Sequence, residues 1–126
     1  MKILDLPLKK EWYNMIESGI KPEEYRDICP YWIVRLLEIV DDDITGNYVP
    51  VTKEMVELIV QPPDSSELLN DAFECCEIRP RHTHVRFRYG YTKRTMLYEI
   101  DSIRIGRGNP KWGAPTDRNV FIIKFH

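Results

Sequence analysis

The longest strand-like segment of this chain, residues 95–105, changes its buried face halfway along. Apolar and polar side chains alternate, but the apolar positions shift from even to odd numbers. Successive side chains of a strand point to opposite faces, so a regular strand cannot bury both sets on one side. A bulge or sharp bend near Asp101–Ser102 restores one buried face, and such bends curve a sheet towards a barrel. The two apolar sets are Met96, Tyr98 and Ile100, then Ile103 and Ile105.

Three other segments are predicted to be strands beside it. Residues 2–6 form a short apolar run that we expect Pro7 to end, because proline cannot continue a strand ladder. Residues 83–89 alternate between apolar and basic side chains, as in a strand with one buried face. Residues 120–125 form an apolar run that closes the sheet. Together these segments predict a small, strongly curved β barrel with a mixed sheet.

Two helices are expected to flank this sheet, which makes the predicted fold class α+β. The first covers Lys9–Ser18 and ends at Gly19, a residue suited to the left-handed position after a helix. The second begins at Pro30, because proline is favoured in a first turn. The expected buried residues are Leu8, Trp12, Met15 and Ile16 in the first helix, and Trp32, Ile33, Leu36, Leu37 and Val40 in the second.

Residues 41–81 are predicted to be an acidic helical insertion within a single domain spanning residues 1–126. Thr52 is expected to cap one short helix, and Asp64–Glu67 resembles a capping box for the next. We interpret this stretch as an insertion because about 40 residues rarely fold alone. The residues expected to be buried in its second helix are Leu68, Leu69, Ala72, Phe73 and Cys76.

Charge is unevenly distributed along the chain. Residues 38–77 carry a net charge of −10 and residues 78–112 a net charge of +7, although the whole chain carries only −2. A basic field attracts polyanions and an acidic field repels them. The asymmetry indicates a polyanionic partner for the basic part, or a protein partner for the acidic insertion. Two segments that pack together and neutralise each other explain it equally well.

The sequence predicts a cytoplasmic protein with no membrane partner. No apolar run approaches the ~18 residues that a membrane span needs. The N-terminal sequence MKILDLPLKKEW contains Asp5 and lysines where a signal peptide is apolar. The three cysteines, Cys29, Cys75 and Cys76, are too few and too badly spaced for a disulfide framework, so we expect free thiols.

The segment GIKPEEYRD, residues 19–27, is the first candidate site. In an extended chain Glu24 and Arg26 share one face, and Lys21 can reach Glu24. A cation, a carboxylate and a planar guanidinium suit a polar ligand with both donors and acceptors, such as a nucleobase and its phosphate. On the charge pattern alone, a ladder of surface salt bridges accounts for the same residues.

A second candidate site combines basic and aromatic residues on the strand and turn at 86–94. Arginines hold phosphates while aromatic faces stack bases, a mixture that suits single-stranded nucleic acid. A cationic outer face with tyrosines partly in the core is the alternative. Trp112, in the loop at 106–115, is expected either to cover a cleft or to anchor the loop. The strand and turn residues are Arg86, Arg88, Tyr89, Tyr91, Lys93 and Arg94.

A metal site is not expected. His82 and His84 lie two residues apart on a predicted strand and could share a metal ion. No third ligand stands at a convincing spacing, although Cys75 and Cys76 are near. Solvated histidines at a strand edge are the simpler interpretation, and no cofactor is predicted.

The order of these segments resembles an ASCH domain, within the PUA-like barrel family. GIKPEEYRD is similar to the family's G-x-K-x-x-E-x-R signature, and it follows a helix and opens a strand as in the family. The resemblance covers residues 2–40 and 83–125 and leaves out the insertion. It implies a PUA-like β barrel flanked by helices. The matching stretches are ILDLPLKKEWYNMIESG, GIKPEEYRD, PYWIVRLL, VRFRYGYTKRTMLYEIDSIRIG and VFIIKF.

The resemblance implies recognition of RNA or of a modified nucleotide, because PUA-like barrels commonly bind RNA and the signature borders the cleft. A protein-interaction module, acting through the acidic insertion, is a further alternative. The implied ligand-binding residues are Lys21, Glu24, Arg26, Arg86, Arg88, Tyr89, Lys93, Arg94 and Trp112.

A hydrolase is another alternative, because one bacterial branch of the family hydrolyses acetylated cytidine with a lysine, a threonine and a later glutamate. Carried over, the lysine is Lys21 and the glutamate is Glu99, whereas Glu24 stands where the threonine would be. Glutamate does not easily replace a threonine nucleophile, but it can act as a general base on water. A nucleoside amide or RNA would be the substrate. If its strand face lines the cleft, Glu99 is expected to be partly desolvated near Lys21 or Arg26.

Overall fold

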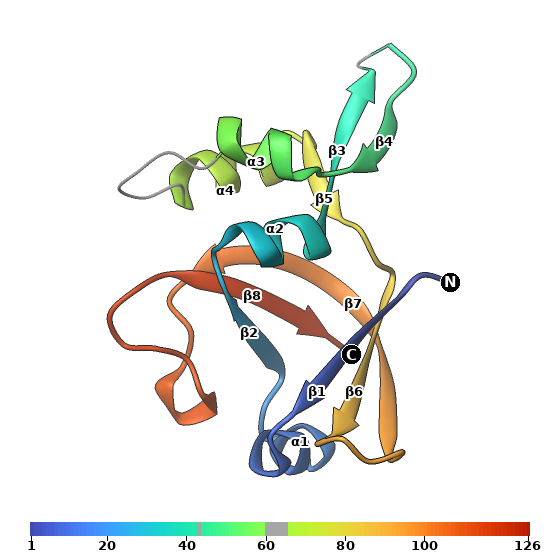
Figure 1. Ribbon diagram of the computed structural model, residues 1–126. Helices are drawn as coiled ribbons and strands as arrows, with labels where there is room; N and C mark the ends of the chain where they lie inside the picture. The colour runs from blue at the N-terminus through green and yellow to red at the C-terminus, as the bar shows by residue number, and fades with distance from the viewer. Residues whose placement is uncertain (43, 60–65) are drawn as a thin grey trace.

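The computed structural model describes residues 1–42, 44–59 and 66–126, and it has an α+β fold built on two sheets. A strongly curled five-stranded sheet has the order β1-β6-β7-β8-β2, and a three-stranded sheet has the order β4-β3-β5. Figure 1 shows the three-stranded sheet, α3 and α4 on one side of the curled sheet. The elements are β1 (Ile3–Leu8), α1 (Lys10–Glu17), β2 (Glu23–Asp27), α2 (Pro30–Leu36), β3 (Leu37–Asp42), β4 (Asn47–Pro50), α3 (Lys53–Ile59), α4 (Ser66–Glu74), β5 (Ile78–Pro80), β6 (His84–Tyr89), β7 (Thr95–Gly106), the 3-10 helix η1 (Pro110–Trp112) and β8 (Val120–Phe125).

Strand β7 contains the predicted bulge. Its first half pairs with β6 and its second half with β8, both antiparallel. The register against β8 shifts between Ile100 and Ser102, which leaves Asp101 as the extra residue. After the shift the odd-numbered Ile103 and Ile105 are buried. The bulge bends β7 into the long arc that joins the two sides of the sheet (Figure 1).

The expectation that Pro7 ends the first strand is wrong. β1 runs in parallel with β6 as far as Leu8, and Pro7 lies opposite Arg88 within that ladder. β1 is an edge strand with β6 as its neighbour in the sheet. An edge strand tolerates proline, because one side of its backbone has no ladder bond to donate.

The helices of the curled sheet differ from the prediction in two ways. In α1 the buried residues are Tyr13 and Ile16, whereas Trp12 is only half-buried. α2 begins at Pro30 as predicted but ends at Leu36, so that Leu37 and Val40 belong to β3. Leu37 is extended there because β3 pairs with both β4 and β5.

The acidic stretch contains strands as well as helices. Thr52 Oγ1 accepts a hydrogen bond from the backbone N–H of Met55 at 3.3 Å, which confirms the predicted cap of α3. Asp64, from the predicted capping box, lies outside the described residues. β3, β4 and β5 form a sheet that the helical prediction for residues 41–81 did not include.

Helix α4 buries fewer of its residues than expected. Leu69 and Phe73 are buried, as predicted. Leu68 is 51% exposed and Cys76 is exposed, so both of those predictions are wrong. One side of a short helix packs on β7, and the positions on its other side remain in contact with solvent.

Side chains from both sheets share one buried cluster. Asn70 of α4 reinforces it at the end of β7: its Nδ2 donates to the Ile105 carbonyl at 3.0 Å, and Ile105 N–H donates to Asn70 Oδ1 at 3.1 Å. Asn70 thereby takes the place of a neighbouring strand. Members of the buried cluster that the two sheets share include Leu6, Ile33, Leu37, Val51, Leu69, Phe73, Val85, Phe87, Ile103 and Phe121.

None of the described helices is long and apolar enough to cross a membrane.

Candidate functional site

The segment at residues 19–27 forms the turn after α1 and then β2. Gly19 ends α1 with a φ of +83°, as predicted, and Lys21 follows before the strand begins. β2 is an edge strand that pairs with β8, with Glu24 opposite Ile123. The loop at residues 107–119 folds back against this strand and contacts its side chains.

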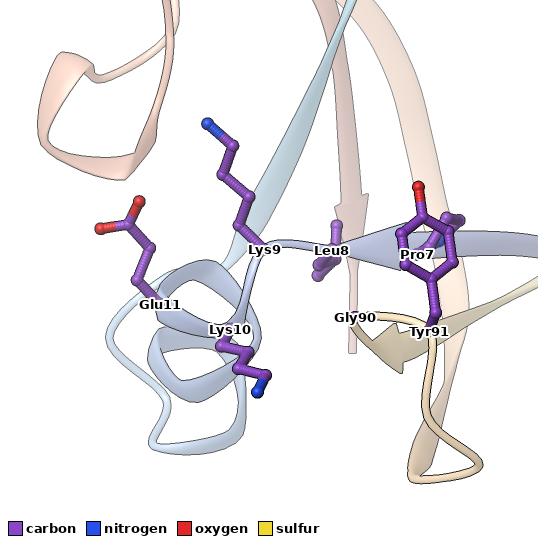
Figure 2. A pocket seen from close by; sticks show the side chains of 7 residues that line it. All are labelled: Pro7, Leu8, Lys9, Lys10, Glu11, Gly90 and Tyr91. Atoms are coloured by element: carbon purple, nitrogen blue, oxygen red, sulfur yellow. The ribbon is translucent and has the colours of Figure 1, made fainter.

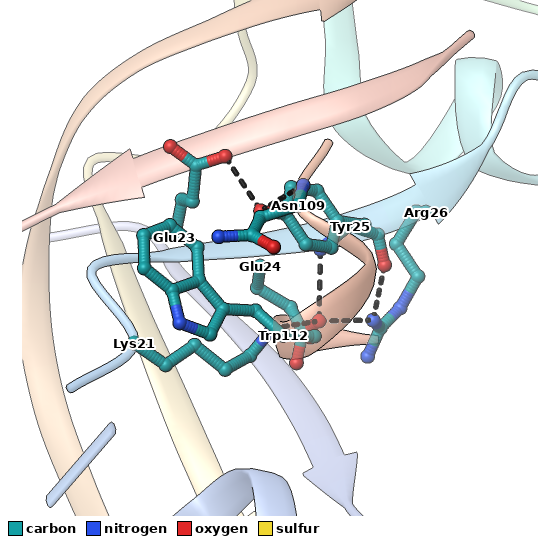
Figure 3. A network of polar contacts seen from close by, with 7 residues as sticks. All are labelled: Lys21, Glu23, Glu24, Tyr25, Arg26, Asn109 and Trp112. Atoms are coloured by element: carbon teal, nitrogen blue, oxygen red, sulfur yellow. Dashed lines mark hydrogen bonds and ion pairs between the residues drawn. The ribbon is translucent and has the colours of Figure 1, made fainter. Parts of the chain in front are cut away.

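Lys21 is a fully buried cation. Its Nζ lies 3.3 Å from Glu24 Oε1 and donates to the backbone carbonyl of Trp112 at 2.5 Å (Figure 3). It also faces the rings of Tyr25 and Trp12, at 4.6 and 5.5 Å from their centroids. Burial lowers the pKa of Lys21 below its usual value, although the charge of Glu24 acts in the opposite direction. Lys21 and Glu24 therefore do not form the ladder of surface salt bridges that the charge pattern also allowed.

Glu24 has one oxygen fully engaged and one with no partner. Its Oε1 accepts the backbone N–H of Tyr25 at 2.8 Å and lies 3.5 Å from Arg26 Nη1. Its Oε2 is buried and has no hydrogen-bond partner among the described residues. An unsatisfied buried acceptor costs about 1–3 kcal/mol. A ligand N–H or O–H that reached this atom would recover that cost.

Arg26 is held from three directions. Its Nη1 donates to the carbonyl of Tyr25 at 2.6 Å and lies close to Glu24, and its guanidinium lies 5.1 Å from the ring centroid of Trp32. Burial lowers the pKa of Arg26 from its usual value, and Glu24 opposes that effect. These contacts fix the guanidinium in one orientation.

An open pocket of about 360 Å³ lies beside this cluster. Arg26, Trp32 and Arg118 line it, together with Tyr25 and residues 113–115 of the loop. The Arg118 guanidinium is exposed and pairs with Asp27 at 3.1 Å. The pocket therefore combines an aromatic ring with two guanidinium groups. Trp32, which the sequence places in the core, is half-buried and forms part of the pocket.

The loop at residues 107–119 packs closely on the cluster. Tyr25 Oη accepts the backbone N–H of Asn109 at 3.0 Å and donates to Glu23 Oε2 at 2.7 Å (Figure 3). Gly108 lies so close to the Tyr25 ring that an added Cβ would come within 2.6 Å of it. Trp112 contributes its carbonyl to Lys21, so its contacts are those of a loop anchor.

Glu99 was expected to be partly desolvated, but its side chain is exposed. It precedes the bulge, where the odd-numbered side chains of β7 face outward, and its side chain is 61% exposed. Its contact is with His126, whose Nε2 lies 3.6 Å from Glu99 Oε2 and whose Nδ1 bonds Asp101. The buried cluster thus joins Lys21 and Glu24, while Glu99 has a different partner.

The three arginines of residues 86–94 have partners within the protein. Arg88 donates to the carbonyl of Thr92, within the turn, and the Tyr89 ring packs edge-on against Tyr13 of α1. Tyr91 is 96% exposed, and Lys93 is exposed. The ion pairs are Arg86 with Asp5 at 3.6 Å and Arg94 with Glu17 at 2.6 Å.

No group of histidine, cysteine, aspartate and glutamate side chains that could hold a metal ion occurs among the described residues. Burial lowers the pKa of His82 below its usual value. Trp12, Trp32 and Arg118 are site residues that the sequence reasoning did not identify. The helical spacing of the two tryptophans indicated core positions, and Arg118 lies in a loop without a pattern.

No protein-family model, no curated protein and no solved structure matches this chain.

Proposed function

We propose that this protein recognises RNA or a modified nucleotide in the pocket between β2, α2 and the loop at residues 107–119. The observation that carries the proposal is the grouping of Trp32, Arg26 and Arg118 around one open pocket. Aromatic faces stack bases and guanidinium groups hold phosphates. We also propose that the curled sheet is the PUA-like barrel of an ASCH domain; the signature strand β2 at the rim of the pocket supports this.

Three residues of the pocket and the neighbouring Glu24 have separate roles in this proposal. The ring of Trp32 stacks on the base. Arg118 exchanges its exposed pairs with Asp27 and Asp117 for a phosphate oxygen, at little cost because surface ion pairs are weak. Arg26, held by Glu24 and Trp32, presents a fixed guanidinium beside the base. Glu24 Oε2 is the adjacent buried acceptor for a ligand N–H.

The test is binding of labelled single-stranded RNA, followed by fluorescence anisotropy at two salt concentrations. Trp32→Ala is expected to weaken binding about tenfold, since stacking contributes about 1–3 kcal/mol per base. Arg118→Ala should weaken it and reduce the salt slope by roughly one phosphate contact. Lys124→Ala removes an exposed charge from β8 and is the control. Equal affinity of all four proteins would contradict the proposal.

Hydrolysis is the second candidate, because Lys21 is fully buried beside Glu24 with a lowered pKa. Lowering the pKa of a lysine raises the fraction of the neutral amine, which is the form that acts as a base or nucleophile, and Glu24 could activate water. The substrate would be a nucleoside amide of the acetylated cytidine type, or RNA. Mass spectrometry of products with wild type and Lys21→Ala decides between the candidates. A product that disappears with Lys21→Ala would establish an enzyme, whereas binding without product supports recognition alone.

A further inference from the structure

A second pocket, of about 520 Å³, lies where the end of β1, the start of α1 and the β6–β7 turn meet (Figure 2). Lys9 and Lys10 line it from the start of α1, and Tyr91 lines it from the turn. Glu11 is the one acidic residue in its lining. In Figure 2, Lys9 and Lys10 point to opposite sides of the chain, so their charges cover a broad surface.

The cations at this pocket are available to a ligand. Arg86 and Arg94, which the sequence assigns to binding, are already in ion pairs with Asp5 and Glu17. Within the described parts of the chain, no ion pair involves Lys9, Lys10 or Lys93. Lys9 and Lys10 at the pocket, and Lys93 two residues after Tyr91 in the turn, therefore have no acidic partner among the described residues; Lys10 Nζ lies 5.3 Å from the ring centroid of Tyr89.

Tyr91 adds an aromatic surface to these charges. Its side chain is 96% exposed, and Pro7 lines the same pocket. A tyrosine at that exposure gains little from packing within the protein. Exposed aromatic rings among lysines are the arrangement that holds unpaired bases and their phosphates. An acidic peptide would use the lysines but would have no use for a stacking ring.

Helix α1 connects this surface with the proposed nucleotide pocket. Trp12 lies one turn after Lys9, about 4.5 Å further along the helix axis. Its ring packs against Gly113, where an added Cβ would approach it to 3.1 Å, and Gly113 lines the other pocket. Lys9, Trp12 and Gly113 thus form a series of neighbouring residues between the two pockets.

We propose that Lys9, Lys10, Lys93 and Tyr91 form a second binding surface for single-stranded RNA, so that the ligand is a polynucleotide. This inference rests on the proposed function. In this proposal one base of the RNA binds at Trp32, and the rest of the RNA strand binds at the second surface. Variants of one surface can therefore be tested separately from variants of the other. Phosphates along the continuing strand contact the three lysines, and one base stacks on Tyr91.

The test compares a mononucleotide with single-stranded RNA of about eight nucleotides, within the usual site size of single-strand binding domains. The variants are Tyr91→Ala and the double variant Lys9→Ala/Lys10→Ala, and Lys53→Ala/Lys124→Ala is the charge-matched control. We expect both test variants to bind the longer RNA about tenfold more weakly and the mononucleotide unchanged. The double variant should also lower the salt slope by about 1.4, the equivalent of two single-strand phosphate contacts.

The possible outcomes separate the two proposals. Unchanged binding of the longer RNA by both variants would overturn the second surface, while Trp32-dependent binding of the mononucleotide would still support the first pocket. A loss with the lysine variant but not with Tyr91→Ala would show only general attraction for polyanions, and it too would overturn the inference. If wild type binds neither the mononucleotide nor RNA, both proposals fail.

Discussion

Lys21 keeps its ammonium group away from water by means of two oxygens and two rings. The Trp112 carbonyl accepts a hydrogen bond from it, Glu24 Oε1 forms an ion pair with it, and the rings of Trp12 and Tyr25 face it. Removing one member of a buried ion pair typically costs about 3–5 kcal/mol, because the remaining charge is left without compensation. Arg26 limits that cost here by remaining beside Glu24.

The stability contributed by Lys21 depends on pH in a defined direction. Its pKa in the folded protein is below the ordinary 10.5, so the unfolded chain binds this proton more tightly. Stability is therefore gained as pH rises through the interval below 10.5 and lost as pH falls through it. We predict that wild type gains stability relative to Lys21→Met as the pH rises towards 10.5.

Urea denaturation at several pH values measures this difference. Lys124→Met, which changes an exposed lysine, serves as the control and should show a constant difference from wild type. A difference between wild type and Lys21→Met that stayed level or shrank with rising pH would show that the Lys21 pKa is not lowered.

The contact between Lys21 and Glu24 could be predicted from sequence, because both residues lie within one short extended segment. Their burial could not. It comes from Trp12, nine residues earlier, and from the loop at residues 107–119, which no local pattern brings to β2. The exposure of Glu99 could not be predicted from sequence either, because tertiary packing decides which face of β7 lies towards the site.

Two helices end in the same hydrogen-bonding pattern with different residues. After α1, Gly19 N–H donates to Ile16 and Ile20 N–H to Met15. After α4, the corresponding donors are Cys76 and Glu77, bonded to Phe73 and Ala72. The pattern requires a left-handed residue, which is Gly19 in one helix and Cys76, with a φ of 64°, in the other.

Substitutions of these two residues should change the free energy of unfolding in opposite directions. Cys76→Gly is predicted to stabilise the fold by about 0.5 kcal/mol, because the relief of left-handed strain, about 1–2 kcal/mol, exceeds the cost of about 0.5–1 kcal/mol from the added backbone entropy of the unfolded chain. Gly19→Ala should destabilise by about 1 kcal/mol; an added Cβ meets no atom within 4 Å, so the cost is conformational. Thermal unfolding measures both. Destabilisation by Cys76→Gly would mean that its thiol contributes a contact worth more than the strain.

Element boundaries were predictable where one residue's backbone chemistry decides them. Gly19 and Pro30 mark helix ends for that reason, and the parity change in β7 requires the bulge at Asp101. The conformations of Pro7 and Leu37 depend instead on which strands lie beside them. Proline ends an interior strand but is tolerated at an edge, and Leu37 leaves α2 because two strands are available for pairing.

At the scale of the molecule, Asn70 is the polar connection between α4 and the curled sheet. Its two hydrogen bonds satisfy both backbone groups of Ile105. Asn70→Ala is predicted to lower the free energy of unfolding by about 2 kcal/mol, because it leaves a partly buried N–H and C=O without a partner. Asn14→Ala, at an exposed position of α1, is the control for helix propensity and should stabilise slightly.

Calorimetry and circular dichroism together test this prediction. Wild type should unfold in one transition in which calorimetric and van't Hoff enthalpies agree. If Asn70→Ala unfolded like Asn14→Ala, the connection between α4 and β7 would be carried by apolar packing alone.

Charge segregation was visible in the sequence, but the pairing of the charges was not. Arg79 and Glu38 form the one ion pair between the acidic and basic segments among the described residues, at 2.5 Å. Arg86 and Arg94 of the basic segment pair with β1 and α1 instead. Mutual neutralisation of the two segments is therefore limited, and the segregated charge remains available to partners.

The tryptophans of this chain number three, and all of them lie around one site: Trp12 against Lys21, Trp32 against Arg26, and Trp112 bonded to Lys21. Ultraviolet emission from the unlabelled protein therefore reports on this neighbourhood and is blind to α3, α4 and the three-stranded sheet. Quenching on addition of a nucleotide would need no dye. By the same logic, an unfolding curve followed by this emission describes the melting of the site.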